Sequence, residues 1–146
     1  MTIHPIDLLL FLRALGLARR AQRVSAESIN RVVEDMTRRG GGNRRYSVDR
    51  LAQATARATA RWARWFGGLD TCLIRSLVLG SMLADREDVA LVIGFRPGVE
   101  DAAVDGHAWV TVAGRAVGSD GILAQNDYSR MTAVPFTRDD PSTEAR

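Results

Sequence analysis

The chain has few residues of several types, and each shortage excludes a class of protein. Cys72 is the one cysteine, so no intramolecular disulfide can form and a disulfide-stapled secreted scaffold is excluded. The apolar run Leu8–Leu12 is followed by Arg13 and is far too short to span a bilayer. Because no secretory leader is visible either, we expect a protein of the reducing cytoplasm without an integral membrane segment.

Lysine is absent, and all 20 basic residues are arginine, which is most simply explained by a GC-rich coding genome. The placement of the charges is uneven. Residues 1–75 hold 14 arginines and 6 acidic residues, whereas residues 76–146 hold 6 arginines and 11 acidic residues. The basic first half could bind nucleic acid, an anionic membrane or an acidic peptide. Alternatively, its arginines could simply lie on the solvent-exposed faces of helices.

What is present is the composition of one ordinary globular domain. The chain has 146 residues, of which 46% are hydrophobic and 25% charged, values that exclude disordered and collagen-like proteins. Apolar residues recur at helical spacing in four segments of the first half: residues 6–23 after Pro5, a segment through Met36 with Ser25 as N-cap, Ser47 to Gly67, and a segment capped by Asp70 or Thr71. We expect the loop at Gly40–Gly42 to be mobile and basic, and Trp62 and Trp65 to lie in the core.

The second half has the pattern of strands. Val89–Phe95 is a continuous apolar run, His107–Val112 alternates, and Arg115–Gly118 follows a turn at Ala113–Gly114. Residues 131–136 are typical of a further short strand. The sequence therefore predicts an α+β protein, with a helical N-terminal half packed on a small antiparallel sheet.

Cys72 falls in the first turn of the fourth predicted helix, which is a chemically favourable position for a thiol. Unpaired backbone N–H groups and the helix dipole favour a thiolate at a helix N-terminus. The alternative is that Cys72 is a small buried side chain of the core, where free cysteines are often found.

His107 and Asp120 complete a candidate catalytic set. If Ala113–Gly114 is a two-residue hairpin loop, Val112 pairs with Arg115, and counting back places His107 opposite Asp120. A carboxylate there would orient the imidazole, as in a nucleophile–base–acid triad. A three-residue loop would instead turn Asp120 to the other face, and each residue alone is equally explained as structural or as part of a turn. Trp109 shares the face of His107 and could wall the cleft or pack in the core.

These residues resemble a known family. The string Thr71–Leu77 with its Cys-Leu-x-Arg, the strand ending in Ile93–Gly94, and His107-Ala108-Trp109-Val110 followed by an Asp after a short turn are similar to the transglutaminase-like proteases of lasso peptide biosynthesis. The resemblance covers about residues 47–136. It implies a transglutaminase-like, papain-like cysteine protease fold, with Cys72 as nucleophile, His107 as general base and then acid, and Asp120 as the orienting carboxylate.

The resemblance also implies a function and partners. Such enzymes are bacterial peptide hydrolases that remove the leader from a ribosomally made lasso peptide precursor before an ATP-dependent macrocyclase closes the ring. Fused versions carry a winged-helix leader-recognition domain, whereas residues 1–46 here are predicted to be two helices and a glycine loop. The chain therefore resembles the stand-alone protease, which acts with a separate leader-recognition protein. No metal or other cofactor is implied.

On this interpretation residues 1–46 form a helical extension for docking a partner or the leader, residues 47–136 the catalytic core, and residues 137–146 a polar tail. Papain-like relatives use an upstream glutamine as an oxyanion donor, but Gln53 is the nearest one before Cys72. The Cys72 backbone N–H is the expected donor, and a second is unassigned. Two alternatives stay open: an amidase or protease of the same fold with another substrate, and a non-catalytic peptide-binding protein. The most arginine-rich helix lacks polar base-reading residues, so nucleic acid is not an expected partner.

Overall fold

The computed structural model describes residues 4–25, 27–97, 105–118, 128 and 130–137. Among these residues four helices precede four strands, so the predicted α+β class is confirmed. The helices are α1 (Pro5–Ala21), α2 (Ile29–Gly40), α3 (Val48–Phe66) and α4 (Cys72–Met82), and a 3₁₀ turn, η1 (Gln22–Ser25), follows α1. The strands are β1 (Val89–Arg96), β2 (Asp105–Val112), β3 (Arg115–Val117) and β4 (Arg130–Pro135).

The strands form one antiparallel sheet in the order β3-β2-β1-β4. The predicted two-residue hairpin is confirmed, because Val112 pairs with Arg115 across Ala113–Gly114. Ala113 and Gly114 have φ angles of 50° and 74°, the left-handed conformation that a tight hairpin turn requires. Further along β2, His107 pairs with Gly94 of β1.

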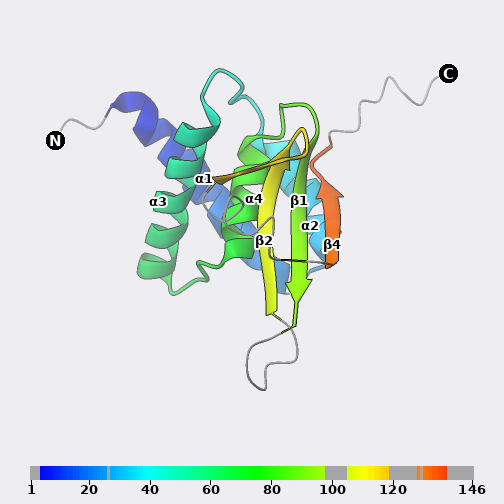
Figure 1. Ribbon diagram of the computed structural model, residues 1–146. Helices are drawn as coiled ribbons and strands as arrows, with labels where there is room; N and C mark the ends of the chain where they lie inside the picture. The colour runs from blue at the N-terminus through cyan, green and yellow to red at the C-terminus, as the bar shows by residue number, and fades with distance from the viewer. Residues whose placement is uncertain (1–3, 26, 98–104, 119–127, 129, 138–146) are drawn as a thin grey trace.

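The helices lie on one face of the sheet, with α4 directly behind β1 and β2 (Figure 1). Almost all of α4 is buried, because its sequence is apolar on every side and it is covered by α1, α2 and α3 as well as by the sheet. Leu10 of α1, Leu77 of α4 and Leu91 of β1 are 0% exposed and belong to the same hydrophobic core. The N-terminal helices therefore share one core with the strands.

The second helix begins later than the sequence pattern predicts. Ser28, not Ser25, is its N-cap, and the Ser28 hydroxyl accepts a hydrogen bond from the backbone N–H of Arg31 at 3.4 Å. The prediction was wrong because the chain adds η1 after α1, which uses residues 22–25 before α2 can start.

Two further expectations need correction. Trp62 packs partly against the core, but Trp65 is 55% exposed, because the buried stripe of α3 ends at Thr59 and its last turn lies outside the core. The glycine loop is anchored instead of free. The Arg13 guanidinium donates hydrogen bonds to the Gly41 carbonyl at 2.5 Å and to the side-chain oxygen of Asn43 at 2.6 Å, and Asn43 is almost fully buried.

Candidate active site

Cys72 is the first residue of α4, as the sequence predicts, and its side chain is half-buried. Thr71 is the N-cap: its hydroxyl accepts a hydrogen bond from the backbone N–H of Ile74 at 3.3 Å. The N–H groups of Cys72 and Leu73 have no acceptor within the helix, since the first turn of any α-helix leaves its donors unpaired. Unpaired donors of this kind can stabilise a negatively charged oxygen at a helix N-terminus.

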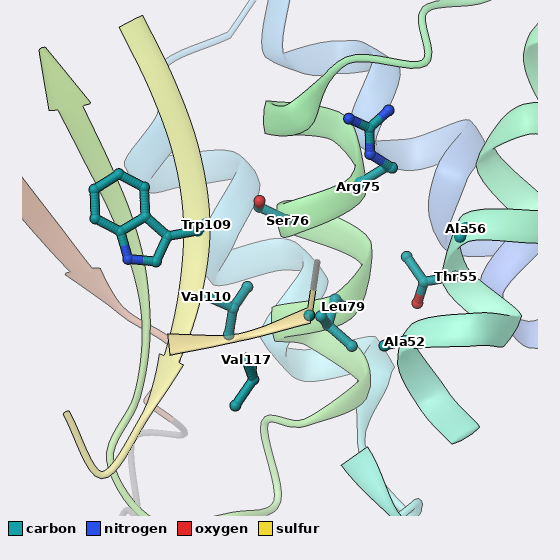
Figure 2. Close-up of a pocket in the computed structure, with 10 residues that line it drawn as sticks. Ala52, Thr55, Ala56, Arg75, Ser76, Leu79, Trp109, Val110 and Val117 are labelled. Carbon is teal, nitrogen blue, oxygen red and sulfur yellow. The ribbon is translucent and has the colours of Figure 1, made fainter. Parts of the chain in front are cut away.

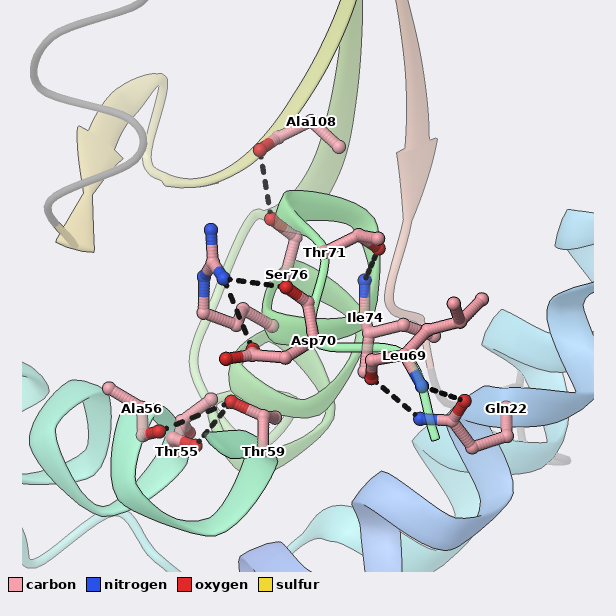
Figure 3. Close-up of polar contacts among 11 residues, drawn as sticks. Gln22, Thr55, Ala56, Thr59, Leu69, Asp70, Thr71, Ile74, Ser76 and Ala108 are labelled. Atoms are coloured by element: carbon pink, nitrogen blue, oxygen red, sulfur yellow. Dashed lines mark hydrogen bonds and ion pairs between the residues drawn. The ribbon is translucent and has the colours of Figure 1, made fainter. Parts of the chain in front are cut away.

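The segment before α4 is tied to the end of α1. The side-chain amide of Gln22 donates to the Leu69 carbonyl and accepts from the Leu69 N–H, each at 2.9 Å (Figure 3). Arg75 then holds the side-chain oxygen of Asp70 at 3.1 Å. These contacts fix the backbone that leads into Cys72, so the position of the thiol depends on α1 as well as on α4.

The helix turn that carries Cys72 lies beside the first half of β2. Ser76, one turn after Cys72, donates a hydrogen bond from its hydroxyl to the Ala108 carbonyl at 3.0 Å (Figure 3). Strand β3 pairs with β2 only from Val110 onward. The Ala108 carbonyl is therefore not used by β3 and can accept the hydrogen bond from the Ser76 hydroxyl. The first turns of α4 therefore lie beside the part of β2 that contains His107, although the His107 side chain, like that of Trp109, is on the face of the sheet that points away from α4.

The His107 ring packs in a cluster with two aromatic rings, those of Tyr128 and Trp109, whose own centroids are 5.9 Å apart. Its centroid is 5.6 Å from that of Tyr128, at an interplanar angle of 18°, and 6.1 Å from that of Trp109, at 27°. His107 and Trp109 thus share a face of the sheet, as their spacing predicts. The close pairing with Gly94 makes room for this stack, because a Cβ there would lie 2.7 Å from Tyr128 and 2.8 Å from the Trp109 ring.

Tyr128, which the sequence pattern did not single out, packs its ring against that of His107. Its pKa is raised, chiefly by burial. The Arg96 guanidinium opposes the rise, and the negative charges of Asp105 and of Cys72 add to it. Burial of the phenol beside His107 is therefore the main reason that its pKa is raised, and the charge of Cys72 is the smallest of these contributions.

Arg96 and Asp105 support Tyr128 from the neighbouring strands. The Arg96 guanidinium lies 5.0 Å above the centre of the Tyr128 ring and donates to Asp105 Oδ2 at 2.7 Å. The Tyr128 hydroxyl donates to the same oxygen at 3.4 Å. Arg96 and Asp105 are direct partners across β1 and β2, so an oppositely charged cross-strand pair was the one signal available in the sequence.

Asp120 lies outside the described residues. The described pairs, Val112 with Arg115 to Val110 with Val117, have the register that the prediction requires. The described strand then ends at Val117, and Gly118 has a φ of 76°. The complete Cys72–His107–Asp120 triad therefore stays a prediction.

A small pocket opens beside α4, lined by residues of its second and later turns (Figure 2). Its volume is about 40 Å³, and it lies between α3, α4, β2 and β3. Arg75, Ser76 and Leu79 line it from α4, three, four and seven residues after Cys72, so they share one helix face with the thiol. Ala52 and Ala56 of α3 close the opposite side.

Trp109 is buried in a small hydrophobic cluster that is separate from the main core between the sheet and the helices. It is 2% exposed, and its indole points away from α4 to contact Val92 and Tyr128 on the other face of the sheet (Figure 2). Within the described ranges, no group of three or more His, Cys, Asp or Glu side chains could hold a metal ion. No helix among the described residues is both long and apolar enough to cross a membrane.

The sequence profile of the transglutaminase-like superfamily matches residues 9–133, from α1 into β4. The chain therefore belongs to the transglutaminase-like superfamily, and its helices and antiparallel sheet have the fold expected for it. This membership supports a function of the peptidase or amidase type. No curated protein and no solved structure matches the chain.

Proposed function

We propose that this protein is a cysteine peptidase that removes the leader from a ribosomally made lasso peptide precursor. The observation that carries the catalytic part is the position of Cys72. It begins a buried helix whose next turn is hydrogen-bonded to β2 beside His107. The superfamily supports hydrolysis of an amide bond, and the leader as substrate rests on the resemblance of Thr71–Leu77 and His107–Val110 to the lasso peptide proteases.

The proposed chemistry is acyl transfer to water. The Cys72 thiolate adds to the carbonyl carbon of the last leader residue, and the backbone N–H of Cys72 stabilises the resulting oxyanion. Imidazolium at His107 gives its proton to the departing amine of the core peptide, so the C–N bond breaks and a thioester remains. His107 then takes a proton from water, the hydroxide adds to the thioester, and the thiolate leaves as the leader carboxylate forms.

Asp120 has the role of orienting His107 in this proposal. Tyr128 and Trp109 add a second restraint, since the two rings limit how the imidazole can tilt. As partners we propose the precursor peptide, a separate leader-recognition protein, and an ATP-dependent macrocyclase that uses the product. An amidase or peptidase with another substrate is the alternative, because the position of Cys72 does not define which peptide it cleaves.

The test is to mix the protein with the precursor and its leader-recognition protein and to follow leader release by mass spectrometry. We expect Cys72→Ala to lower the rate by roughly a thousandfold or more, and Asp120→Asn by about a hundredfold or more. His107→Ala, which removes the proposed base, should also lower the rate, and its matched control is His4→Ala, because His4 is exposed and lies outside α1. Retained cleavage in Cys72→Ala would disprove the proposed mechanism. Cleavage of unrelated peptides in preference to the precursor would favour the alternative.

A further inference from the structure

A groove lined by arginines runs along α1, and the residues that line it come well before Cys72 in the sequence. Its volume is about 810 Å³. Arg13, Arg19, Arg20 and Arg23 line it from α1 and η1, and Arg39 lines it from α2. Neither the peptidase chemistry nor the superfamily profile assigns a role to this groove.

The positive charge in the groove is only partly balanced. Asp35 pairs with both Arg20, at 3.7 Å, and Arg39, at 3.2 Å. The guanidinium groups of Arg19 and Arg23 have no acidic partner within the described part of the chain, and both side chains are exposed. Like charges held on one surface attract a ligand of opposite charge, so the groove favours an anion.

Gly16 keeps the floor of the groove open. It lies in the middle of α1, where glycine is an unfavourable helix residue. Packing does not require it, because a Cβ at this position would have no atom within 4 Å. The missing side chain leaves room beside the backbone of α1 between the flanking arginines.

The groove continues into an exposed apolar surface on the same helix. Leu8, Leu9 and Leu12 are 49%, 48% and 53% exposed. They lie one to two turns before Gly16 on the side of α1 that faces away from the core. A ligand along α1 would therefore meet apolar side chains first and guanidinium groups next.

We propose that this groove binds an acidic peptide segment whose adjacent apolar side chains cover Leu8, Leu9 and Leu12. The charge of the groove matches carboxylates, and the three leucines match aliphatic side chains. A nucleic acid fits less well, because the described residues that line the groove include no aromatic ring for base stacking and no Asn or Gln for base reading. A membrane fits less well because two helices shape the site as a concave groove and a bilayer needs a protruding face.

The experiment is a binding titration by fluorescence anisotropy, with the full chain and a labelled synthetic peptide of leucines followed by glutamates. A peptide with lysines in place of the glutamates, a single-stranded DNA oligonucleotide and phosphatidylserine vesicles are the comparison ligands. The test variant is Arg19→Glu/Arg23→Glu. The matched control is Arg64→Glu/Arg115→Glu, which makes the same charge change on exposed arginines of α3 and β3 that do not line the groove.

We expect the acidic peptide to bind the native chain, with an affinity that falls as salt is added. The test variant should lose about tenfold or more in affinity, and the control should stay within about twofold. Circular dichroism checks that both variants are folded, and Arg19→Gln/Arg23→Gln, with no added negative charge, should show a smaller loss. Equal binding by test and control variants, no binding to the native chain, or tighter binding of the oligonucleotide or vesicles would overturn the proposal. The assay requires no cleavage, so its failure is separate from failure of the proposed peptidase function.

Discussion

At the scale of single residues, the surroundings of His107 are defined by contacts that no local pattern contains. Its parity with Trp109 follows from strand geometry and is confirmed. The stacking of Tyr128 is a contact between residues 21 positions apart, formed because Gly94 leaves space on β1. Sequence periodicity indicates which residues share a strand face, but it does not indicate which side chain from a distant segment will cover that face.

The ionisation of Tyr128 is a direct check on this arrangement. Because burial favours the neutral phenol, we expect its pKa to lie above the ordinary value of 10.0. The neutral form then stabilises the fold below pH 10, and this contribution is lost as the pH rises through the folded-state pKa. The measurement is an ultraviolet titration of phenolate absorbance for the native chain and for Tyr128→Phe. The difference between the two titration curves gives the ionisation of Tyr128 alone. Tyr46→Phe is the control. A difference titration centred at or below pH 10.0 would contradict the described surroundings.

If the pocket between α3, α4 and β2 receives the substrate side chain next to the cleaved bond, its size predicts a preference for small side chains. Ala56→Leu should fill space between α3 and α4, because Ala56 lines the pocket. We expect kcat/KM to fall by about tenfold for peptides with valine or leucine next to the cleaved bond, because their side chains would lose an apolar contact in the filled pocket. For glycine peptides, which have no side chain to place there, kcat/KM should change little. Ala60→Leu, an exposed position one turn later on α3, is the control. An identical effect on glycine and leucine peptides would show that the pocket does not contact substrate.

At the scale of helices and strands, local signals define most boundaries. Pro5 begins α1, Ser47 caps α3, Gly67 ends it in a left-handed conformation, and Thr71 caps α4. The two-residue hairpin between β2 and β3 is predicted for the same reason, because the turn and the alternation agree. The prediction of Ser25 as the N-cap of α2 was wrong because two serines precede the apolar stripe of this helix. Only the packing at the end of α1 decides which of them is the cap.

Replacing a helical glycine with alanine should have opposite effects on stability at Gly40 and at Gly16. A Cβ on Gly40, the last residue of α2, would lie 2.1 Å from the backbone carbonyl oxygen of Ser81 in α4. Backbone cannot move aside easily, so Gly40→Ala should destabilise the protein by about 1–3 kcal/mol. Gly16→Ala meets nothing within 4 Å and should stabilise it by up to about 1 kcal/mol. Urea denaturation measures both, and a Gly40→Ala variant as stable as Gly16→Ala would contradict the close approach of α2 and α4.

At the scale of the whole molecule, the α+β class follows from the change of periodicity along the chain, but the order of the strands does not. The pairing of β4 with β1 joins residues 35 to 45 positions apart, from Phe95 with Arg130 to Ala90 with Pro135, and connections of that length leave no register signal in the sequence. The same holds for α1. Its pattern predicts an amphipathic helix, while only the structure shows Leu10, Ala14 and Leu17 in the core beneath α4.

We therefore expect residues 1–46 to be needed for folding in addition to any docking role. The profile match begins within α1, and α1 packs against both α3 and α4. A chain of residues 47–146 would expose the apolar side of α4, so it should lack a cooperative thermal transition. Thermal melting followed by circular dichroism gives the answer. Leu9→Ser, an exposed substitution on α1, is the control and should melt like the native chain. A cooperative melt of the shortened chain would show that the catalytic core folds alone.

The contact between Gln22 and Leu69 has a thermodynamic consequence. Gln22 and Arg23 are neighbours in η1, so one short turn both lines the basic groove and holds the segment that leads into Cys72. If a ligand in the groove shifts the equilibrium of that segment, it must change the affinity for a peptide bound at Cys72 by some factor. By reciprocity, the peptide at Cys72 changes the affinity of the groove for its ligand by the same factor. The Gln22 side chain would then help to link the two sites, and Gln22→Ala would weaken this link while also loosening the backbone that leads into Cys72.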